Sequence, residues 1–334
     1  MKPPGIKGWN FSQEAIRKAV ESDKMLLIDV ETSNVCNMRC PYCYRDVYGE
    51  KYPLKNELSL EERFSIIDQA FDVGCKSIKI PGAGEPLLDP LVWNQIEYAR
   101  RKDMDVILFT NGLLLTESVV RRLKKLSVSV IIKFNSFRRE VEDRIVGMPG
   151  YFDRRNEKLE MLIEEGFNRK TPTMLGIDTV ITRFNKEEII RIFRFCRDNN
   201  IFPIIKPFMP VGGALRVLDW QIPFKEVLKL YKQAWEIDRK EYGFDYPFSL
   251  TYIGAPCDQR KYALFVDILG NVYFCTGNNQ KLGNVRETSL KEIWFREDVK
   301  RVRRMDYSVC PPRKAFWLKS GYMPKSMEEM FLKV

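Results

Sequence analysis

Short apolar runs rich in β-branched residues alternate with longer amphipathic segments between residue 25 and about residue 207. The apolar runs predict strands, because they are short, bounded by polar or turn residues, and rich in Val and Ile. These predicted strands cover 25–32, 77–82, 105–110, 128–135, 175–182 and 202–207. Strand–helix alternation of this kind indicates right-handed βαβ units and therefore a parallel sheet.

Six units are fewer than the eight of a closed barrel. In either a partial barrel or an open sheet, we expect the active site at the carboxyl ends of the strands, where the loops carry function. Two segments between the strands, 59–74 and 186–200, have apolar residues at helical spacing. Ser59 with Glu62 predicts a capping box at the start of the first helix, and Gly74 predicts its end.

The alternation of strand and helix patterns ends after residue 210. The stretch 210–223 is interrupted by Gly and Pro, 224–241 is helical in pattern, and 261–275 predicts two strands around a Gly-Asn turn. We therefore predict a helical extension over 1–24, an α/β core over 25–210, a linker helix region over 211–245 and a small α+β domain over 246–334.

Composition limits the cellular setting and the partners. No apolar run reaches the eighteen or so residues of a membrane span, and the N-terminus lacks the apolar region of a secretory signal. The chain has eight cysteines, which in the absence of an export signal are expected to be reduced thiols in the cytoplasm. We expect no membrane partner.

The chain has no histidine and a net charge of +10. Without histidine, zinc sites with His ligands, Ser-His-Asp catalysis and non-haem iron facial triads are excluded, so any metal must be held by Cys or carboxylate. The positive charge suits either a solvated surface or an acidic partner. Because the basic residues are scattered, we do not expect nucleic acid to be that partner.

Three cysteines stand close together directly after the first predicted strand, with the spacing Cys36-x3-Cys40-x2-Cys43. Three thiolates can ligate three irons of a cubane iron–sulfur cluster and leave the fourth iron open. A structural zinc site needs a fourth ligand, which no His or nearby Cys offers, and a disulfide needs an oxidising compartment. An open iron can be chelated by an amine and a carboxylate of a small molecule.

This cysteine motif, with aromatic Tyr42 before its last cysteine, resembles that of the radical S-adenosylmethionine (SAM) superfamily. The resemblance implies a partial (β/α)6 TIM-like barrel, a [4Fe–4S] cluster with an open iron site, and SAM as cofactor. Gly84 and Glu85 follow the second strand and resemble the family's GGE element, which receives the amino group of the methionine moiety. The alternatives without a role in SAM binding are that Gly84 makes a tight turn and that Glu85 is a solvated loop acid.

Two further positions match the family less specifically. Asn135 or Ser136, after the fourth strand, stands near the family's ribose-contacting position, and Arg183, after the fifth, is a candidate for the methionine carboxylate. Asn135 and Ser136 are also compatible with an ordinary turn. Arg183 is also placed to pair with Glu187 or Glu188 on the next helix.

A second cysteine set, Cys257, Cys275 and Cys310, lies in the C-terminal region. The pattern C-x12-G-x4-C from Cys257 to Cys275 resembles the start of a SPASM domain, but the CxxCxxxC run that completes that domain is missing. The resemblance implies the shorter twitch variant with a second, auxiliary [4Fe–4S] cluster. Its fourth ligand stays open, and the alternative is three unrelated thiols.

Cys75 and Cys196 belong to neither set. Cys75 precedes the second strand and Cys196 lies on an apolar helix face, so both are expected to be core residues. The alternative is that one donates a hydrogen atom to a substrate radical.

The resemblance implies reductive cleavage of SAM to a 5′-deoxyadenosyl radical that abstracts a hydrogen atom from a substrate. An external one-electron donor such as ferredoxin or flavodoxin is the implied partner. Only about 25 residues precede the first strand, too few for a leader-binding domain, so we expect a small polar substrate (a sugar, aminocyclitol or nucleotide derivative) and its oxidation, epimerisation or rearrangement. The alternatives are a maturase acting on a ribosomally made peptide and a non-catalytic zinc- or nucleic-acid-binding protein.

Overall fold

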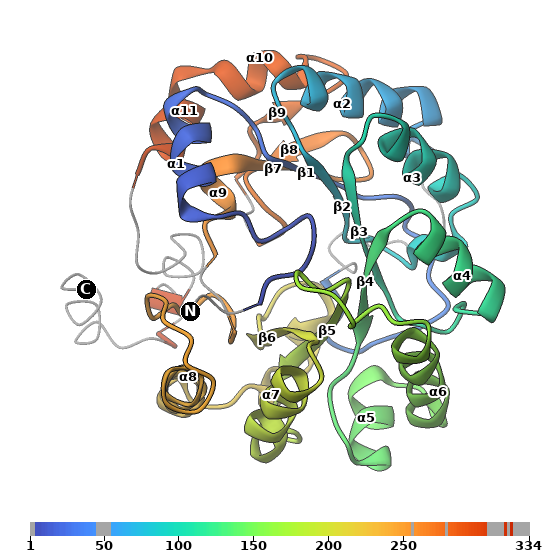
Figure 1. Ribbon diagram of the computed structural model, residues 1–334, viewed down its shortest axis with the longest axis vertical. Helices are drawn as coiled ribbons and strands as arrows, with labels where there is room; N and C mark the ends of the chain where they lie inside the picture. The colour runs from blue at the N-terminus through green and yellow to red at the C-terminus, as the bar shows by residue number, and fades with distance from the viewer. Residues whose placement is uncertain are drawn as a thin grey trace.

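The computed structural model describes residues 4–44, 55–254, 257–277, 280–305, 317–318 and 321–322. Within these ranges, the six strands of the barrel run parallel in the spatial order β6-β5-β4-β3-β2-β1. Their bounds are β1 Leu27–Val30, β2 Ser77–Ile80, β3 Asp105–Thr110, β4 Val128–Lys133, β5 Leu175–Ile181 and β6 Phe202–Pro207. They curve into an arc that does not close (Figure 1). The prediction of a partial (β/α)6 barrel is confirmed.

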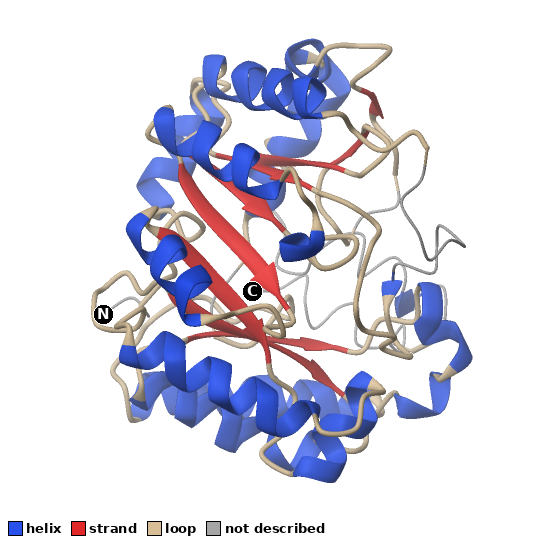
Figure 2. Ribbon diagram, turned by 90° about the vertical axis from the view of Figure 1, so that its right-hand side faces the viewer, coloured by secondary structure: helices blue, strands red, loops and turns tan. Residues whose placement is uncertain are grey.

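Helices cover the outer face of this arc, and Figure 2 shows them stacked outside the strands. They are α2 Leu60–Asp72, α3 Val92–Arg101, α4 Glu117–Lys125, α5 Arg139–Val146, α6 Tyr151–Glu164, α7 Ile189–Asp198 and α8 Phe224–Lys240. Short 3₁₀ turns occur at η2 Pro86–Leu88, η3 Lys186–Glu188, η4 Gly212–Arg216 and η5 Leu218–Trp220. The main hydrophobic core fills the space between these helices and the sheet.

The predicted capping box of the helix over 59–74 is present. The Ser59 hydroxyl accepts a hydrogen bond from the Glu62 amide at 3.2 Å, and the Glu62 carboxylate accepts one from the Ser59 amide at 2.8 Å. The helix ends at Asp72, and Gly74 follows with a φ of +99°. This positive φ explains why glycine stands where the chain turns into β2. In the segment 186–200, the first turn is a 3₁₀ turn and the α-helix begins only at Ile189.

The N-terminal segment fills the amino end of the barrel. Trp9 lies with its ring centroid 6.0 Å from that of Phe109 and 6.2 Å from that of Phe202. Ile6 pairs with Thr173 just before β5, and α1 Gln13–Glu21 follows. The cysteine loop follows β1 and the Gly-Glu element follows β2, so both lie at the opposite, carboxyl end of the strands.

The C-terminal segment extends the same sheet beyond β1. It contains α9 Gln259–Tyr262, β7 Ala263–Val266, β8 Asn271–Tyr273, β9 Gly283–Asn284, α10 Leu290–Phe295 and α11 Glu297–Arg303. β7 lies parallel to β1, with Leu27 opposite Ala263, and β8 returns antiparallel to β7. The predicted hairpin is therefore confirmed, and it is joined edge to edge to the barrel. The predicted domain boundaries stay predictions.

None of the helices in the described ranges has the length and apolarity needed to cross a membrane.

Candidate active site at the carboxyl ends of the strands

The three-cysteine loop follows β1 at the carboxyl end of the barrel. Cys36, Cys40 and Cys43 are all partly exposed, and none is in a disulfide. The Cys43 amide donates to the Cys40 carbonyl at 3.0 Å, which closes a tight turn between these two residues. Across the described part of the chain, no three Cys, Asp or Glu side chains are gathered closely enough to hold an ion. All three thiols thus belong to one partly exposed loop at the carboxyl end of the barrel.

The turn after β6 holds this loop from the other side. The Gly213 amide donates to the Cys43 carbonyl at 2.8 Å. A Cβ on Gly213 would lie 2.6 Å from the Pro41 carbonyl oxygen, and one on Gly212 would lie 2.5 Å from that of Tyr44. Only glycine permits these approaches. The two glycines of η4 therefore form a backbone cradle for the end of the cysteine loop.

The Gly-Glu element after β2 is fastened to the start of the same loop. The Gly84 amide donates to the Ser33 carbonyl, and the Glu85 amide donates to the Val35 carbonyl, each at 2.8 Å. A Cβ on Gly84 would lie 2.0 Å from the Val35 carbonyl oxygen, which no side chain tolerates. Gly84 is thus required by close backbone approach, whereas Gly82, with a φ of +70°, makes the turn.

The Glu85 carboxylate is buried, with 2% of the residue exposed, so it is not a solvated loop acid. It accepts hydrogen bonds from the Thr110 hydroxyl and the Asn111 amide, both at 2.7 Å. Burial raises the pKa of Glu85 to about 7, although these donors favour its charged form. In the described ranges Glu85 makes no ion pair. A cationic amine beside it would compensate its charge.

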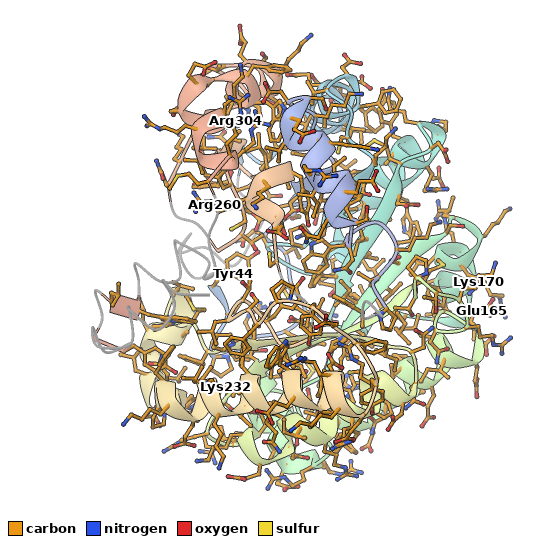
Figure 3. The ribbon with its side chains drawn as sticks, turned by 60° about the vertical axis from the view of Figure 1, so that its left-hand side comes forward. Tyr44, Glu165, Lys170, Lys232, Arg260 and Arg304 are labelled. Carbon is orange, nitrogen blue, oxygen red and sulfur yellow. The ribbon has the colours of Figure 1, made fainter. Side chains whose placement is uncertain are left out.

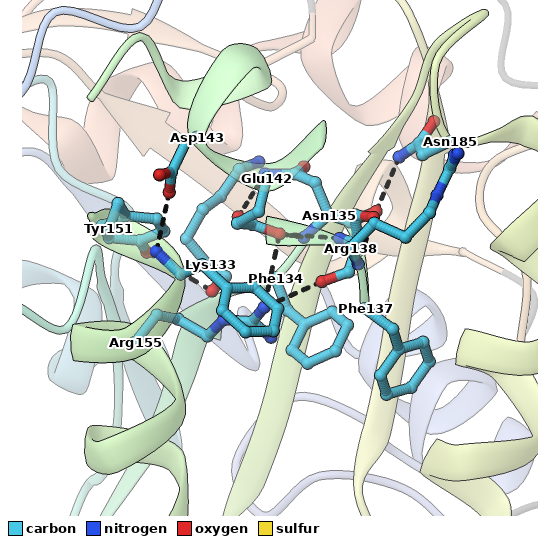
Figure 4. Close-up of polar contacts among 12 residues, drawn as sticks. Lys133, Phe134, Asn135, Phe137, Arg138, Glu142, Asp143, Tyr151, Arg155 and Asn185 are labelled. Carbon is cyan, nitrogen blue, oxygen red and sulfur yellow. Dashed lines mark hydrogen bonds and ion pairs between the residues drawn. The ribbon is translucent and has the colours of Figure 1, made fainter. Parts of the chain in front are cut away.

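Asn135 and Ser136 are both buried after β4. Figure 4 shows Asn135 in a polar network with Glu142 and Asn185. The Asn135 and Ser136 amides donate to the Glu142 carboxylate at 2.7 and 2.6 Å, and the Ser136 hydroxyl donates to Glu188. The Ser136 carbonyl accepts from Arg155 at 2.8 Å. These bonds fix the end of β4 against α5, α6 and η3. The role of these two residues in binding the ribose stays a prediction.

Arg183 is half-exposed and forms an ion pair of 2.8 Å with Asp219 of η5. The alternative prediction, that Arg183 pairs with Glu187 or Glu188, is wrong, because the chain after β5 turns Arg183 toward the segment that follows β6. The Arg183 amide also donates to the Trp220 carbonyl at 2.9 Å. Its contact with the methionine carboxylate stays a prediction.

Tyr42 packs against the interior of the barrel mouth. Its ring centroid lies 6.5 Å from that of Trp220 and 5.1 Å from the Lys133 ammonium. Burial raises the pKa of Tyr42 well above its usual value. Tyr42 therefore links the cysteine loop to charged side chains inside the barrel.

Sequence reasoning missed those charged side chains. Asp178 on β5 forms two ion pairs, one of 2.9 Å with Lys133 on β4 and one of 2.7 Å with Lys206 on β6. Although burial alone would raise it, the two ammonium groups lower the pKa of Asp178 to about 2. The signal was available: each of these residues interrupts an otherwise apolar strand, where a charge needs a partner or a function.

The second cysteine set is only partly described. Cys257 precedes α9 and Cys275 follows β8; both are partly exposed and neither is in a disulfide. Cys310 lies outside the described residues. Since β7 and β8 continue the sheet from β1, the barrel and the hairpin that carries Cys275 share one sheet.

Cys75 and Cys196 are buried away from the barrel mouth. Cys75 stands before β2, at the amino end of the barrel, and donates to the Ser77 carbonyl at 3.1 Å. Cys196 lies on α7 in the core outside the sheet. Burial raises the pKa of Cys75 to about 12 and that of Cys196 still further. Both positions suit the expected core role, and neither lies among the loops at the carboxyl ends.

Comparison with protein families shows which family the chain belongs to. The sequence profile of the Radical SAM superfamily matches residues 30–196, half of the chain. The chain belongs to the radical SAM superfamily. A second profile, that of SPASM, described as an iron–sulfur cluster-binding domain, matches residues 257–312. Membership implies a [4Fe–4S] cluster and SAM, and the SPASM match implies auxiliary iron–sulfur clusters.

The residues at the barrel mouth fit these groups. Three thiols share the loop of Cys36, Cys40 and Cys43, and a buried carboxylate without an ion pair in the described ranges, Glu85, stands beside it. Glycines admit the backbone there where a Cβ would collide. When bound, the cluster and SAM supply a 5′-deoxyadenosyl radical.

Similar radical SAM proteins span most of the chain. An AdoMet-dependent heme synthase from Methanosarcina barkeri is 27% identical over 309 residues, which cover 83% of this chain and 84% of that protein. The mycofactocin maturase MftC from Mycolicibacterium smegmatis is 28% identical over 76% of this chain and 64% of its own length. The crystal structure of Streptococcus suis SuiB bound to precursor peptide SuiA superimposes with a TM-score of 0.65 at 18% identity, covering 88% of this chain and 71% of SuiB.

Proposed function

We propose that this radical SAM enzyme oxidises a small anionic molecule held inside the barrel, and that a carboxylate-bearing tetrapyrrole is the substrate to test first. The observation that carries the proposal is the cluster of Lys133, Asp178 and Lys206 on three adjacent strands. An external one-electron donor, such as ferredoxin or flavodoxin, completes the reaction.

The charge of this cluster supports an anionic substrate. Two ammonium groups share one carboxylate, so the cluster has a net charge of +1. Lys133 and Asp178 are directly paired across β4 and β5, and both side chains are 13% exposed. Lys206 is 34% exposed. A substrate anion is attracted to these two ammonium groups when it enters the site.

The position of the cluster supports contact with the substrate. The Lys133 ammonium lies 5.1 Å from the ring centroid of Tyr42, which belongs to the cysteine loop. A substrate anion that binds Lys133 therefore lies next to the cysteine loop, which would hold the iron–sulfur cluster. Val180, Phe208, Ala214 and Trp220 form a buried apolar group beside Tyr42, so the Lys133 ammonium lies close to an apolar part of the barrel.

The heme synthase relative supports the tetrapyrrole. That protein aligns with this chain over more than four-fifths of both lengths. Haem and its precursors combine a flat apolar ring with carboxylate side chains, which matches the pairing of aromatic and cationic side chains at this barrel mouth. Among the small polar substrates expected from sequence, a phosphorylated nucleotide also satisfies the two lysines, whereas a neutral sugar does not.

The chain's own residues prepare the site in separate ways. In this proposal Glu85 accepts the ammonium of SAM, and the backbone around Gly84 holds that carboxylate against the cysteine loop. Lys133 and Lys206 bind the substrate anion, and Asp178 orients both lysines through its ion pairs. Oxidation is favoured over isomerisation because the SPASM region carries an additional redox centre on the same sheet.

A peptide is the second candidate substrate, because a mycofactocin maturase is among the relatives that align over most of this chain. A peptide could present its own carboxylates to the same lysines. The likeness to SuiB concerns the fold alone.

The test is SAM turnover by the reconstituted holoenzyme under reducing, anaerobic conditions. Iron coproporphyrin, a carboxylate-bearing tetrapyrrole named in a further relative, the Fe-coproporphyrin III synthase of Methanosarcina barkeri, is supplied first. GTP and a short acidic peptide are supplied separately, and 5′-deoxyadenosine is quantified. The proposal expects coproporphyrin to raise deoxyadenosine formation well above the substrate-free rate and to be converted with loss of side-chain hydrogen. Stimulation by the peptide alone reverses the ranking, and stimulation by none of the anions at any concentration rejects the anionic substrate.

A further inference from the structure

Glu31 connects three parts of the site although no motif singled it out. It lies one residue beyond β1 and is fully buried. One carboxyl oxygen is 2.6 Å from the hydroxyl of Tyr44, which follows the last cysteine of the loop. The other accepts a hydrogen bond from the Ile268 amide at 3.2 Å, in the turn between β7 and β8. Figure 3 shows Tyr44 between Arg260 of α9 and Lys232 of α8.

Among the described residues, two acceptors lie within reach of the Tyr44 hydroxyl, which has only one hydrogen. It lies 2.6 Å from Glu31 and 3.0 Å from the carbonyl oxygen of Gly82, in the turn after β2. The Gly82 carbonyl can only accept. If Tyr44 donates to Gly82, the short contact with Glu31 needs a hydrogen from the carboxyl group. Both contacts are hydrogen bonds only when Glu31 is a neutral acid.

The charges around Glu31 favour that neutral form. Asp29 precedes it on β1 and Asp267 lies beyond the end of β7; both are fully buried. Lys79 of β2 is engaged 2.9 Å from Asp29. Asp267 accepts from the Leu269 and Asn271 amides at 2.9 and 2.8 Å, and Tyr273 of β8 lies 3.4 Å from it. Burial, together with the charges of Asp267 and Asp29, raises the pKa of Glu31 to about 8.

We propose that Glu31 is a positioning residue held as a neutral acid, whose proton fastens the cysteine loop to the turn after β2 and to the auxiliary hairpin. Through Tyr44 it reaches the loop of Cys36, Cys40 and Cys43, and through Ile268 it reaches the β7–β8 turn that leads to Cys275. Glu31 touches neither substrate nor cofactor. When Glu31 loses its proton, the single hydrogen of the Tyr44 hydroxyl is drawn to the carboxylate, the contact with the Gly82 carbonyl is lost, and the cysteine loop loosens from the turn after β2.

This inference does not depend on which substrate the enzyme uses. It concerns the geometry that holds the cysteine loop, so its signature is a pH dependence of the holoenzyme without substrate. Because the raised pKa applies only to the folded state, the folded protein binds one more proton than the unfolded chain between about pH 4.5 and about pH 8. Stability from this group therefore falls as the pH rises through that window.

The decisive variant is Glu31→Gln, which is neutral at every pH. Its amide group can donate to the Tyr44 oxygen, and its carbonyl can accept from the Ile268 amide, so it reproduces each bond of the neutral acid. The experiment compares wild type and E31Q as reconstituted holoenzymes between pH 6 and pH 9. It records iron content, the electron paramagnetic resonance signal of the reduced clusters, and the unfolding temperature.

The expected result is that E31Q matches wild type at pH 7 in iron content and signal. Wild type then changes its signal with a midpoint near pH 8, and E31Q does not. The unfolding temperature of E31Q also falls less than that of wild type between pH 6 and pH 8. Tyr44→Phe, which keeps Glu31 but lacks the hydroxyl, loses the change in signal and retains the pH dependence of stability.

Three results overturn the inference. They are a failure of E31Q to fold or to hold iron as wild type does, an E31Q signal at pH 7 that differs from that of wild type, and a pH step of equal size in both proteins. The substrate-dependent rate is not used, so a wrong substrate leaves this test unaffected.

Discussion

Gly84 and Val35 approach so closely that a Cβ on the glycine would lie 2.0 Å from the valine carbonyl oxygen. The same stretch is joined by hydrogen bonds from Gly84 to Ser33 and from Glu85 to Val35. The turn after β2 and the start of the cysteine loop therefore move as one piece. The family's two specific motifs, distant in sequence, are joined here by two backbone hydrogen bonds and one close backbone approach.

Gly84→Ala is expected to separate these two motifs. The added methyl group meets backbone rather than a flexible side chain, so the cysteine loop or the turn after β2 must shift. We expect the variant to lose most of its capacity for SAM cleavage and to bind less iron in the first cluster, as measured by iron analysis and optical spectra. Gly150→Ala is the control, because its Cβ meets nothing within 4 Å and only its φ of +73° causes strain. Equal behaviour of both variants would contradict the account.

Glu85→Gln is expected to weaken SAM binding and to remove its pH dependence. In wild type the buried Glu85 has a pKa of about 7, so the carboxylate is increasingly charged as the pH rises from 6 to 7.5, while an α-ammonium with a pKa of about 8 is still mostly protonated. SAM affinity should therefore rise over this range in wild type and stay flat in E85Q. At pH 7.5 the loss should be roughly 10- to 100-fold, since a hydrogen bond to a charged group contributes about 1.5–3 kcal/mol.

Isothermal titration of the reconstituted proteins with SAM measures this difference. Glu165→Gln, on an exposed residue at the end of α6, is the control and should bind SAM as wild type does. A pH-independent wild-type affinity would show that Glu85 does not receive the ammonium.

Lys133→Met and Lys206→Met test the substrate site. Each variant removes one cation from Asp178 and leaves it the other, so the fold should persist. We expect KM for the anionic substrate to rise by roughly 10- to 100-fold, the cost of one charge-assisted hydrogen bond, while SAM cleavage without substrate changes little. Lys232→Met, on an exposed residue of α8, is the matched control. A rise in KM that is no larger than in the control would reject the role of the two lysines.

Cys257→Ala and Cys275→Ala test the auxiliary cluster. Two [4Fe–4S] clusters correspond to about eight irons per chain, and either substitution should reduce this to about four without abolishing reductive SAM cleavage. Replacing Cys36, Cys40 and Cys43 together should instead abolish SAM cleavage and leave about four irons. An unchanged iron content in both single variants would remove these two thiols from the ligand set.

Local patterns were sufficient for most of the barrel. The strands over 105–110 and 202–207 were predicted to the residue, because a β-branched run bounded by polar residues defines a buried parallel strand. The capping box of Ser59 and Glu62 was predicted because its partners are three residues apart. Such features depend on neighbours in sequence, so they can be read without knowing the fold.

Contacts between distant segments could not be predicted in this way. The pairing of β7 with β1 joins strands more than two hundred residues apart, and no local pattern indicates which barrel edge receives the hairpin. The predicted partner of Arg183 was wrong for the same reason, since its actual partner, Asp219, follows a different strand. Charges inside the apolar strands, such as Asp178, were visible in the sequence, but their grouping depends on the register of the sheet.

The most direct test of the account is label transfer from an anionic substrate into 5′-deoxyadenosine. Iron coproporphyrin carrying deuterium on its carboxylate-bearing side chains is incubated with the reduced holoenzyme and SAM, and the deoxyadenosine is analysed by mass spectrometry. The account predicts deuterium in the deoxyadenosine in wild type and its strong reduction in Lys133→Met. Active cleavage of SAM with deoxyadenosine that contains no deuterium would contradict it.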